Sequence, residues 1–228
     1  AALDRWVGKG WRQRPSIGPA LHAAETQGAK VVPGLLALAQ SDAQPPLVRA
    51  TAAELLVPHM RPALWATALE LLEDADPEVR IAALQMIEPG DFANRMRAAA
   101  PLLADPVRGV RIEAARVLAG IPEAQMPDER REAYRAALNE YIEAQQQDAD
   151  WPTANVNLGN LYLRLGRVDE AVAAYRRALK LDPQLVSAWV NLADAWRAQG
   201  DEKQAEATLR QGLAKLPRSP DLLHALGL

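Results

Sequence analysis

The chain has 228 residues, of which 49% are hydrophobic and 24% charged, and its formal net charge is −3. This length fits one or two globular domains, and the slight negative charge argues against a surface that binds nucleic acid. The sequence has no cysteine, which excludes disulfides, cysteine-ligated zinc and covalent haem attachment within it. No apolar run approaches the roughly 20 residues that a membrane-spanning helix needs, so we expect no membrane association.

The chain begins with Ala1-Ala2-Leu3 and has neither an initiator methionine nor a signal-peptide pattern at this end. We interpret residues 1–15 as the end of a preceding domain in a longer or processed protein. The next residues are predicted to form two helices, at about 17–27 and 31–40, which begin an array of helical hairpins.

A sequence pattern then recurs at a constant interval. It is visible in Pro46-Leu47-Val48-Arg49, Pro77-Glu78-Val79-Arg80 and Arg108-Gly109-Val110-Arg111, whose equivalent positions are 31 apart, and again in Leu71-Leu72 and Leu102-Leu103. Helices are predicted at about 62–73, 77–88, 92–104 and 106–119. Asp76-Pro77 and Asp105-Pro106 each suggest a capping carboxylate followed by proline at the first helical position. A hairpin of this length cannot bury its apolar face alone, so successive hairpins must stack.

Residues 16–121 therefore resemble HEAT-like repeats of the short variety. The resemblance rests on the Val-Arg pair and on an aspartate six residues before the arginine, as in Asp74/Arg80 and Asp105/Arg111. It implies a ladder of ion pairs between neighbouring repeats, formed by Arg49, Asp74, Arg80, Asp105 and Arg111. For Arg49 the preceding aspartate, Asp42, is seven residues away. The alternative is an anion-binding row of arginines, but charges on an inner face generally need partners, which favours the ladder.

From about residue 128 the interval changes to 34. One unit carries Leu158-Gly159-x-x-Tyr162, Ala171-x-x-x-Tyr175, Ala178 and Pro183, and the next carries Trp189-x-x-Leu192-Ala193-x-x-Trp196, Ala205-x-x-x-Leu209, Gly212 and Pro217. This arrangement resembles the tetratricopeptide repeat (TPR). The resemblance implies a partial unit, two full units and the start of a further unit or cap within 128–228. Asn155 departs from it where tryptophan is usual, and Gly212 where alanine is commoner. We expect Trp189 and Trp196 to pack in the core.

In TPR proteins the first helix of each hairpin lines a concave groove. Asn157 and Asn191 are one interval apart, in the same column of these helices, and Asn160 lies one turn from Asn157. The resemblance implies that such asparagines hydrogen-bond the main chain of a bound peptide, because an amide both donates and accepts. Arg164, Asp194 and Arg197 would add charge specificity. The alternative is that asparagine is simply frequent in this column. Val156 stands where carboxylate-clamping members have lysine, which argues against a full clamp.

Motifs for catalysis or metal binding are not found. The three histidines, His22, His59 and His224, lack ligand spacing, and no nucleophile, phosphate-loop or dinucleotide motif occurs. We therefore predict an all-α protein, an α-solenoid of stacked hairpins, that is not an enzyme, holds no cofactor or metal and binds a protein or peptide partner.

Two alternative functions stay open. Residues 1–120 resemble the repeat region of certain large bacterial proteins in which a multihaem c-type cytochrome domain precedes HEAT-like and TPR repeats. That resemblance implies an upstream haem domain, a periplasmic location and a role in docking a redox partner; otherwise the location would be cytoplasmic. The second alternative is a HEAT solenoid that binds nucleic acid, although the net charge makes nucleic acid an unlikely partner. Fold alone names no partner.

Overall fold

The structure is a computed structural model that describes residues 18–19, 22–23 and 28–227. Every regular element within these residues is helical, so the all-α prediction is confirmed. The predicted segment 1–15 and most of the predicted helix 17–27 lie outside the described residues. The chain divides into two compact units after Leu118. No helix in the described part combines the length and apolar character that crossing a membrane would require.

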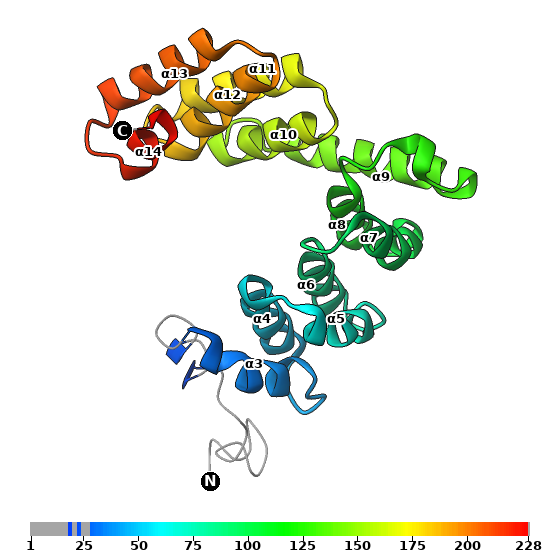
Figure 1. Ribbon diagram of the computed structural model, residues 1–228. Helices are drawn as coiled ribbons and strands as arrows, with labels where there is room; N and C mark the ends of the chain where they lie inside the picture. Colours follow the sequence, from blue (N-terminus) through cyan, green and yellow to red (C-terminus); the bar gives the residue numbers. More distant parts are fainter. Residues whose placement is uncertain (1–17, 20–21, 24–27, 228) are drawn as a thin grey trace. The chain divides into compact units, whose positions relative to one another are not determined.

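The first unit is a stack of helical hairpins (Figure 1). Its elements are η2 (Gly28–Val31), α3 (Val32–Ala39), α4 (Pro46–Leu56), η3 (Val57–His59), η4 (Pro62–Leu64), α5 (Trp65–Leu71), α6 (Pro77–Ile87), α7 (Phe92–Ala99), η5 (Ala100–Ala104) and α8 (Arg108–Leu118). Helices α3, α5 and α7 pack on α4, α6 and α8 respectively, and α4, α6 and α8 also pack on one another in a row.

The interval of 31 falls on equivalent places in successive hairpins. The second helices α4, α6 and α8 begin at residues 46, 77 and 108 and end at 56, 87 and 118. Their equivalent inner positions are fully buried, and they are Ala52, Ala83 and Ala114 near the middle and Leu56, Ile87 and Leu118 at the end. The small residues in the middle let neighbouring helices of the row approach closely. The larger residues at the helix ends fill the space between those helices there.

The prediction that the last of these helices begins at Pro106 was wrong, because α8 begins at Arg108. The Asp105 carboxylate accepts a hydrogen bond from the Val107 N–H at 2.8 Å and so holds a turn before the helix. The first helical carbonyl is that of Val107, which accepts from the Arg111 N–H. In the preceding repeat, Asp76 caps α6 by accepting from the Glu78 N–H. Val107 occupies the position of Asp76, so α8 has no equivalent side-chain cap at that position.

The first helices of the hairpins are less regular than the second. The predicted helix 92–104 is divided, since α7 ends at Ala99 and the chain continues as the 3₁₀ segment η5. Pro101 explains the change, because proline lacks the N–H and its ring clashes with the carbonyl four residues earlier. The predicted helix 62–73 likewise starts as the 3₁₀ segment η4, which contains Pro62.

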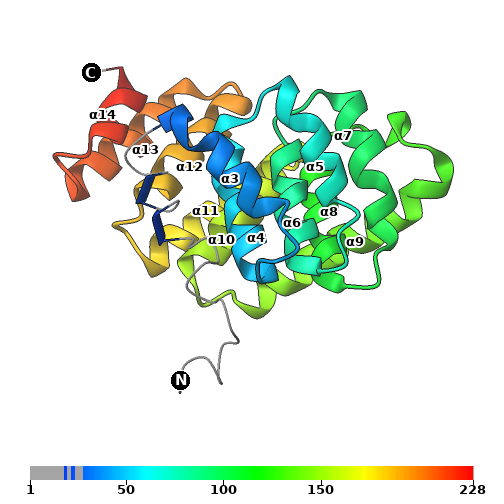
Figure 2. The same ribbon diagram turned by 90° about the horizontal axis from the view of Figure 1, so that it is seen from below.

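The second unit is again a stack of helical hairpins (Figures 1 and 2). Its helices recur at the interval of 34 residues. Its elements are η6 (Glu123–Gln125), α9 (Asp128–Gln147), α10 (Pro152–Arg164), α11 (Val168–Leu181), α12 (Val186–Ala198), α13 (Glu202–Lys215) and α14 (Pro220–Leu226). The bounds of α10 and α12 differ by one interval at both ends, as do those of α11 and α13, and α14 begins one interval after α12. Helix α9 ends one interval before α11, so the partial unit supplies a second helix of the repeat without a first helix before it.

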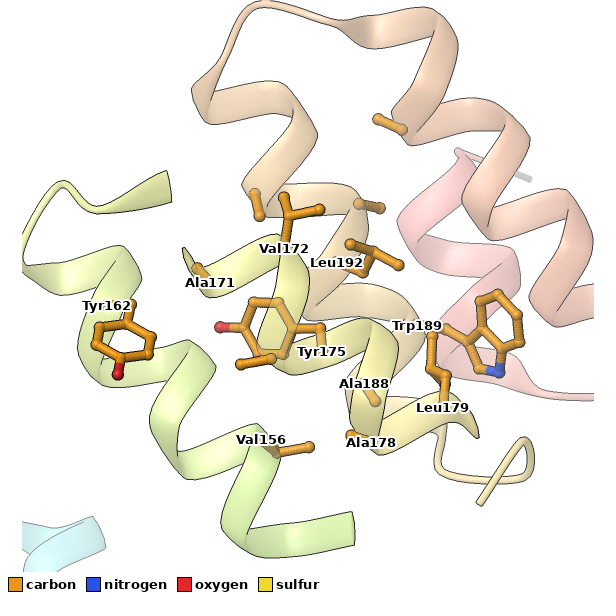
Figure 3. Close-up of a cluster of buried hydrophobic side chains, with 14 of the residues drawn as sticks. Val156, Tyr162, Ala171, Val172, Tyr175, Ala178, Leu179, Ala188, Trp189 and Leu192 are labelled. Carbon is orange, nitrogen blue, oxygen red and sulfur yellow. The ribbon is translucent and has the colours of Figure 1, made fainter. Parts of the chain in front are cut away.

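The core of the second unit lies between its paired helices and is shown in Figure 3. Tyr175 of α11 is fully buried, and its ring lies over Gly159 of α10, where a Cβ atom would come within 2.3 Å of the ring. Only glycine allows α10 and α11 to be this close. Gly166 and Gly200 end α10 and α12 with φ angles of 73° and 78°, a conformation that favours glycine at a helix end.

The two tryptophans expected in this core differ. Trp189 is 8% exposed, and its Nε1–H donates to the Pro183 carbonyl at 2.9 Å. Trp196 is only partly buried, and the Arg176 guanidinium lies 5.1 Å from its ring centre. Trp196 is therefore shared between the core and a cation–π contact at the surface.

Candidate functional site

The three predicted asparagines lie on neighbouring first helices of the second unit. Asn157 and Asn160 are exposed on α10, and Asn191 is partly exposed on α12, which packs on α10. Their amides are already engaged. The Asn157 Nδ2 donates to Gln145 Oε1 of α9 at 3.1 Å, and the Asn191 Nδ2 donates to Asn160 Oδ1 at 2.8 Å.

Asn160 joins the surface to the core. Its Oδ1 accepts from Asn191 and also from the buried Tyr175 hydroxyl, at 2.8 Å in both cases. The three residues come from α10, α11 and α12, so the network fixes the orientation of the Asn191 amide relative to two other helices. A side chain held in this way loses little further rotamer freedom when it contacts a ligand.

Asn157 and Asn191 are left with the same free hydrogen-bonding groups. Each amide nitrogen has two hydrogens and uses one of them in the contact just described. The second N–H and the carbonyl oxygen of each amide have no partner among the described residues. A donor and an acceptor side by side match the carbonyl and N–H of a peptide main chain, and this arrangement recurs at the repeat interval.

The three predicted charged residues lie in different settings. Arg197 donates to Asp194 at 2.9 Å and to the Ala225 carbonyl of α14 at 2.9 Å, so it helps to hold α14 in place. Arg164 is half-buried at the end of α10. Its main-chain carbonyl packs closely on Gly120, where an added Cβ atom would lie 3.3 Å from the carbonyl oxygen. Asp194 remains exposed on α12, in the turn after Asn191.

The predicted ladder residues lie between the hairpins of the first unit. Arg49 donates to the Asp74 carboxylate and, at 3.1 Å, to the Ala39 carbonyl, whereas Asp42 is 3.8 Å away. Arg80 is bound to Asp105 through two hydrogen bonds, Nε to Oδ2 at 2.9 Å and Nη2 to Oδ1 at 3.0 Å. Each of these two arginines therefore pairs with the aspartate of the following repeat.

Contacts within one repeat complete these rungs. The Arg80 Nη1 donates to the carbonyl of Asp74, six residues earlier, at 2.7 Å, and the Arg111 Nη1 donates to the carbonyl of Asp105 at 2.9 Å. Asp74 and Asp105 thus each provide the main-chain carbonyl to the arginine six residues later, Arg80 or Arg111, and the carboxylate to the arginine of the preceding repeat, Arg49 or Arg80. Such sharing gives the arginines structural partners and leaves no open row of guanidinium groups in the described part of this unit.

The contacts made by Gln145 and by Asn155 could not be inferred from the sequence. Gln145, which orients Asn157, belongs to α9, where only one helix of the repeat is present. Asn155 replaces the usual tryptophan and yet makes the equivalent contact: its Nδ2 donates to the Ala149 carbonyl at 2.7 Å, as Trp189 donates to Pro183 in the next repeat. Asn155 is 1% exposed and also accepts from Arg177 at 3.2 Å. A buried amide therefore provides the hydrogen bond that the indole provides in the next repeat.

Two tyrosine hydroxyls are buried in the second unit. Burial raises the pKa of Tyr134 to about 12, the Glu123 carboxylate adds to the shift, and Arg164 opposes it. Burial also raises the pKa of Tyr175, and the charge of Asp194 adds to the effect. Both hydroxyls therefore stay protonated in the folded state at pH values where an unfolded tyrosine ionises.

These shifts predict a loss of stability in alkali. Below the ordinary tyrosine pKa of about 10 the two hydroxyls are protonated in the folded and the unfolded chain, so their stabilising contribution is fully present. As the pH rises from there through about 12, only the unfolded chain releases the protons, and the free energy of unfolding falls. Urea unfolding at a series of pH values measures the slope. Tyr134→Phe should make the slope shallower, and an unchanged slope would contradict this assignment.

Comparison with known families agrees with the geometry of the second unit. Residues 128–186 and 156–220 each match the family model of the tetratricopeptide repeat. The second unit therefore contains tetratricopeptide repeats, which generally mediate protein–protein interactions and typically act as non-catalytic scaffolds. No curated protein sequence matches the chain. The HEAT-like assignment of the first unit, the cytochrome association and the nucleic-acid alternative stay predictions from the sequence.

Proposed function

We propose that the chain is a non-catalytic scaffold and that its tetratricopeptide unit binds an extended segment of a partner protein along α10 and α12. The observation that carries this proposal is the recurrence, at Asn157 and Asn191, of an amide that a side chain of another helix orients through one N–H and that keeps its second N–H and its carbonyl oxygen free. Two such amides at successive repeats would read the peptide main chain, and Asp194 would contribute to the choice of side chains.

The proposal predicts that single asparagine substitutions weaken binding without unfolding the protein. A net hydrogen bond contributes about 0.5–1.5 kcal/mol, so Asn191→Ala should lower the affinity for a selected peptide roughly two- to twelvefold. An array of short synthetic peptides identifies the binding sequences, and titration calorimetry measures their affinities. Gln211→Ala is the matched control, because it removes an exposed amide from α13, a second helix.

A modified peptide separates main-chain recognition from side-chain recognition. Methylating the peptide nitrogen that contacts Asn191 should weaken binding to the unaltered protein by a similar factor. The same methylation should not lower the affinity for Asn191→Ala any further, because the contact with Asn191 is already lost in that variant. If Asn157→Ala and Asn191→Ala leave every selected peptide bound as before, with helicity unchanged, the proposed site is wrong.

A further inference from the structure

The first unit has an apolar groove on its first helices, away from the asparagines. Two hollows of 470 and 340 Å³ lie on either side of Trp65, and both are also bordered by Asn94 of α7. Helices α5 and α7 follow one another along this face of the unit (Figures 1 and 2). We call the two hollows together the Trp65 groove.

The walls of the groove are apolar. The larger hollow is lined by Met60, Pro62, Met86 and Pro89, and the smaller one by Leu69, Leu72, Pro101 and Leu102. Leu69 is 40% exposed, so the smaller hollow presents a large aliphatic side chain to solvent. The Trp65 ring between the hollows lies against Gly90, where a Cβ atom would come within 2.5 Å of the ring. The groove therefore offers two places for apolar side chains, separated by a fixed indole.

The charges at the rim indicate which occupant fits. Asp91 accepts from the Asn94 main-chain and side-chain nitrogens, and Arg97 donates to Asn94 at 3.3 Å, so hydrogen bonds hold these two charged side chains against Asn94. The exposed Arg61 at the larger hollow and the exposed Glu73 at the smaller one have no ion-pair or hydrogen-bond partner for their side chains among the described residues. The rim thus presents an unpartnered positive side chain at one hollow and an unpartnered negative side chain at the other, beside the hydrogen-bonded Asp91 and Arg97.

We propose that the Trp65 groove binds an amphipathic helix of a partner protein, with apolar side chains on successive turns in the two hollows. The rim requires an acidic residue at the end beside Arg61 and a basic residue at the end beside Glu73. A helix satisfies its own main-chain hydrogen bonds, which suits walls that consist mainly of apolar side chains. This site is separate from the asparagines of the second unit and does not depend on them.

Three synthetic helical peptides test the proposal. All carry the same two leucines four residues apart, and their ends carry aspartate at both, lysine at both, or aspartate at one and lysine at the other. The mixed peptide should bind the unaltered protein about three- to fivefold more tightly than the others, the range expected for exposed ion pairs. The resonance of Trp65 in protein labelled with fluorotryptophan should shift, and Trp65→Phe assigns it among the six tryptophans.

Charge substitutions should change the preferred peptide. Arg61→Glu makes both of the unpartnered rim side chains acidic and should favour the peptide with lysine at both ends. Glu73→Lys should favour the peptide with aspartate at both ends, and the double variant should again favour the mixed one. Both positions are exposed, so folding should be retained. Equal affinities in all variants, or an unmoved Trp65 resonance, would overturn the proposal. Dimerisation of the protein that Arg61→Glu abolishes would also overturn it, by assigning the groove to a second copy.

Discussion

Replacing Arg80 with alanine should lower the free energy of unfolding of the first unit by about 3–5 kcal/mol, the range for breaking a buried ion pair. The side chains of Arg80 and Asp105 are only 11% and 6% exposed. The substitution would leave the Asp105 charge buried without its main partner, and it would also remove the donor for the carbonyls of Asp74 and Ala75. Urea unfolding followed by circular dichroism measures the loss.

Three further variants separate the ion pair from simple truncation. Arg61→Ala removes an exposed arginine of the same unit and should change the stability by less than about 0.5 kcal/mol. The loss of stability in Arg80→Lys should lie between those of Arg61→Ala and Arg80→Ala, because lysine keeps the charge but cannot form both hydrogen bonds to Asp105. Replacing Arg80 and Asp105 together by methionine and leucine should recover only part of the loss, because the carbonyls of Asp74 and Ala75 and the Val107 N–H would still lack their partners. A loss for Arg80→Ala as small as that for Arg61→Ala would show that the rung contributes little.

Replacing Trp189 with alanine should destabilise the second unit by about 3–5 kcal/mol, the usual range for large-to-small substitutions in a core. The indole fills the space between α12, α13 and α14, and its Nε1–H is the donor to Pro183. Alanine would leave a cavity and an unpaired carbonyl. Thermal or urea unfolding measures the effect, and Asn155→Ala at the equivalent position should cost less, because the side chain removed is smaller.

A second substitution makes the prediction for Trp189 more specific. A Cβ atom on Gly212 would lie 3.0 Å from Trp189 Cγ and 3.1 Å from Leu222 Cδ1. With the indole removed, Gly212→Ala meets less resistance and also gains the helix propensity of alanine over glycine, up to about 1 kcal/mol. Gly212→Ala should therefore be more favourable in the Trp189→Ala background than in the unaltered protein. Equal effects in both backgrounds would mean that the two residues do not share this space.

The repeat intervals predicted most of the fold, because they record positions that must be alike in every hairpin. Residues 31 apart in the first unit and 34 apart in the second occupy equivalent places in successive helices. The start of α8 was missed for a local reason. Asp105-Pro106 has the composition of a helix start, but the Asp105 carboxylate is required by Arg80 and by the Val107 N–H. Which of these contacts the Asp105 carboxylate makes depends on the tertiary structure, because Arg80 comes from the preceding repeat.

The candidate site was only partly accessible to sequence reasoning. The column of Asn157 and Asn191 follows from the interval, whereas the partners that orient these amides lie on other helices. Gln145 is 12 residues from Asn157, and Asn160 is 31 residues from Asn191. Neither distance in sequence equals the repeat interval of this unit. Contacts of this kind depend on how helices pack, and a periodic pattern does not encode them.

The rungs between hairpins have a consequence for how this chain can change in length. Arg49 contacts Asp74 and Arg80 contacts Asp105, in each case an aspartate 25 residues ahead. Loss of residues 61–91 as a block would bring Asp105 to the place of Asp74, and Arg49 would again meet a carboxylate. Loss of a few residues between an arginine and the aspartate 25 residues ahead would instead move the two members of that ion pair apart. Growth or shortening by whole modules is therefore the change that this half of the molecule tolerates best.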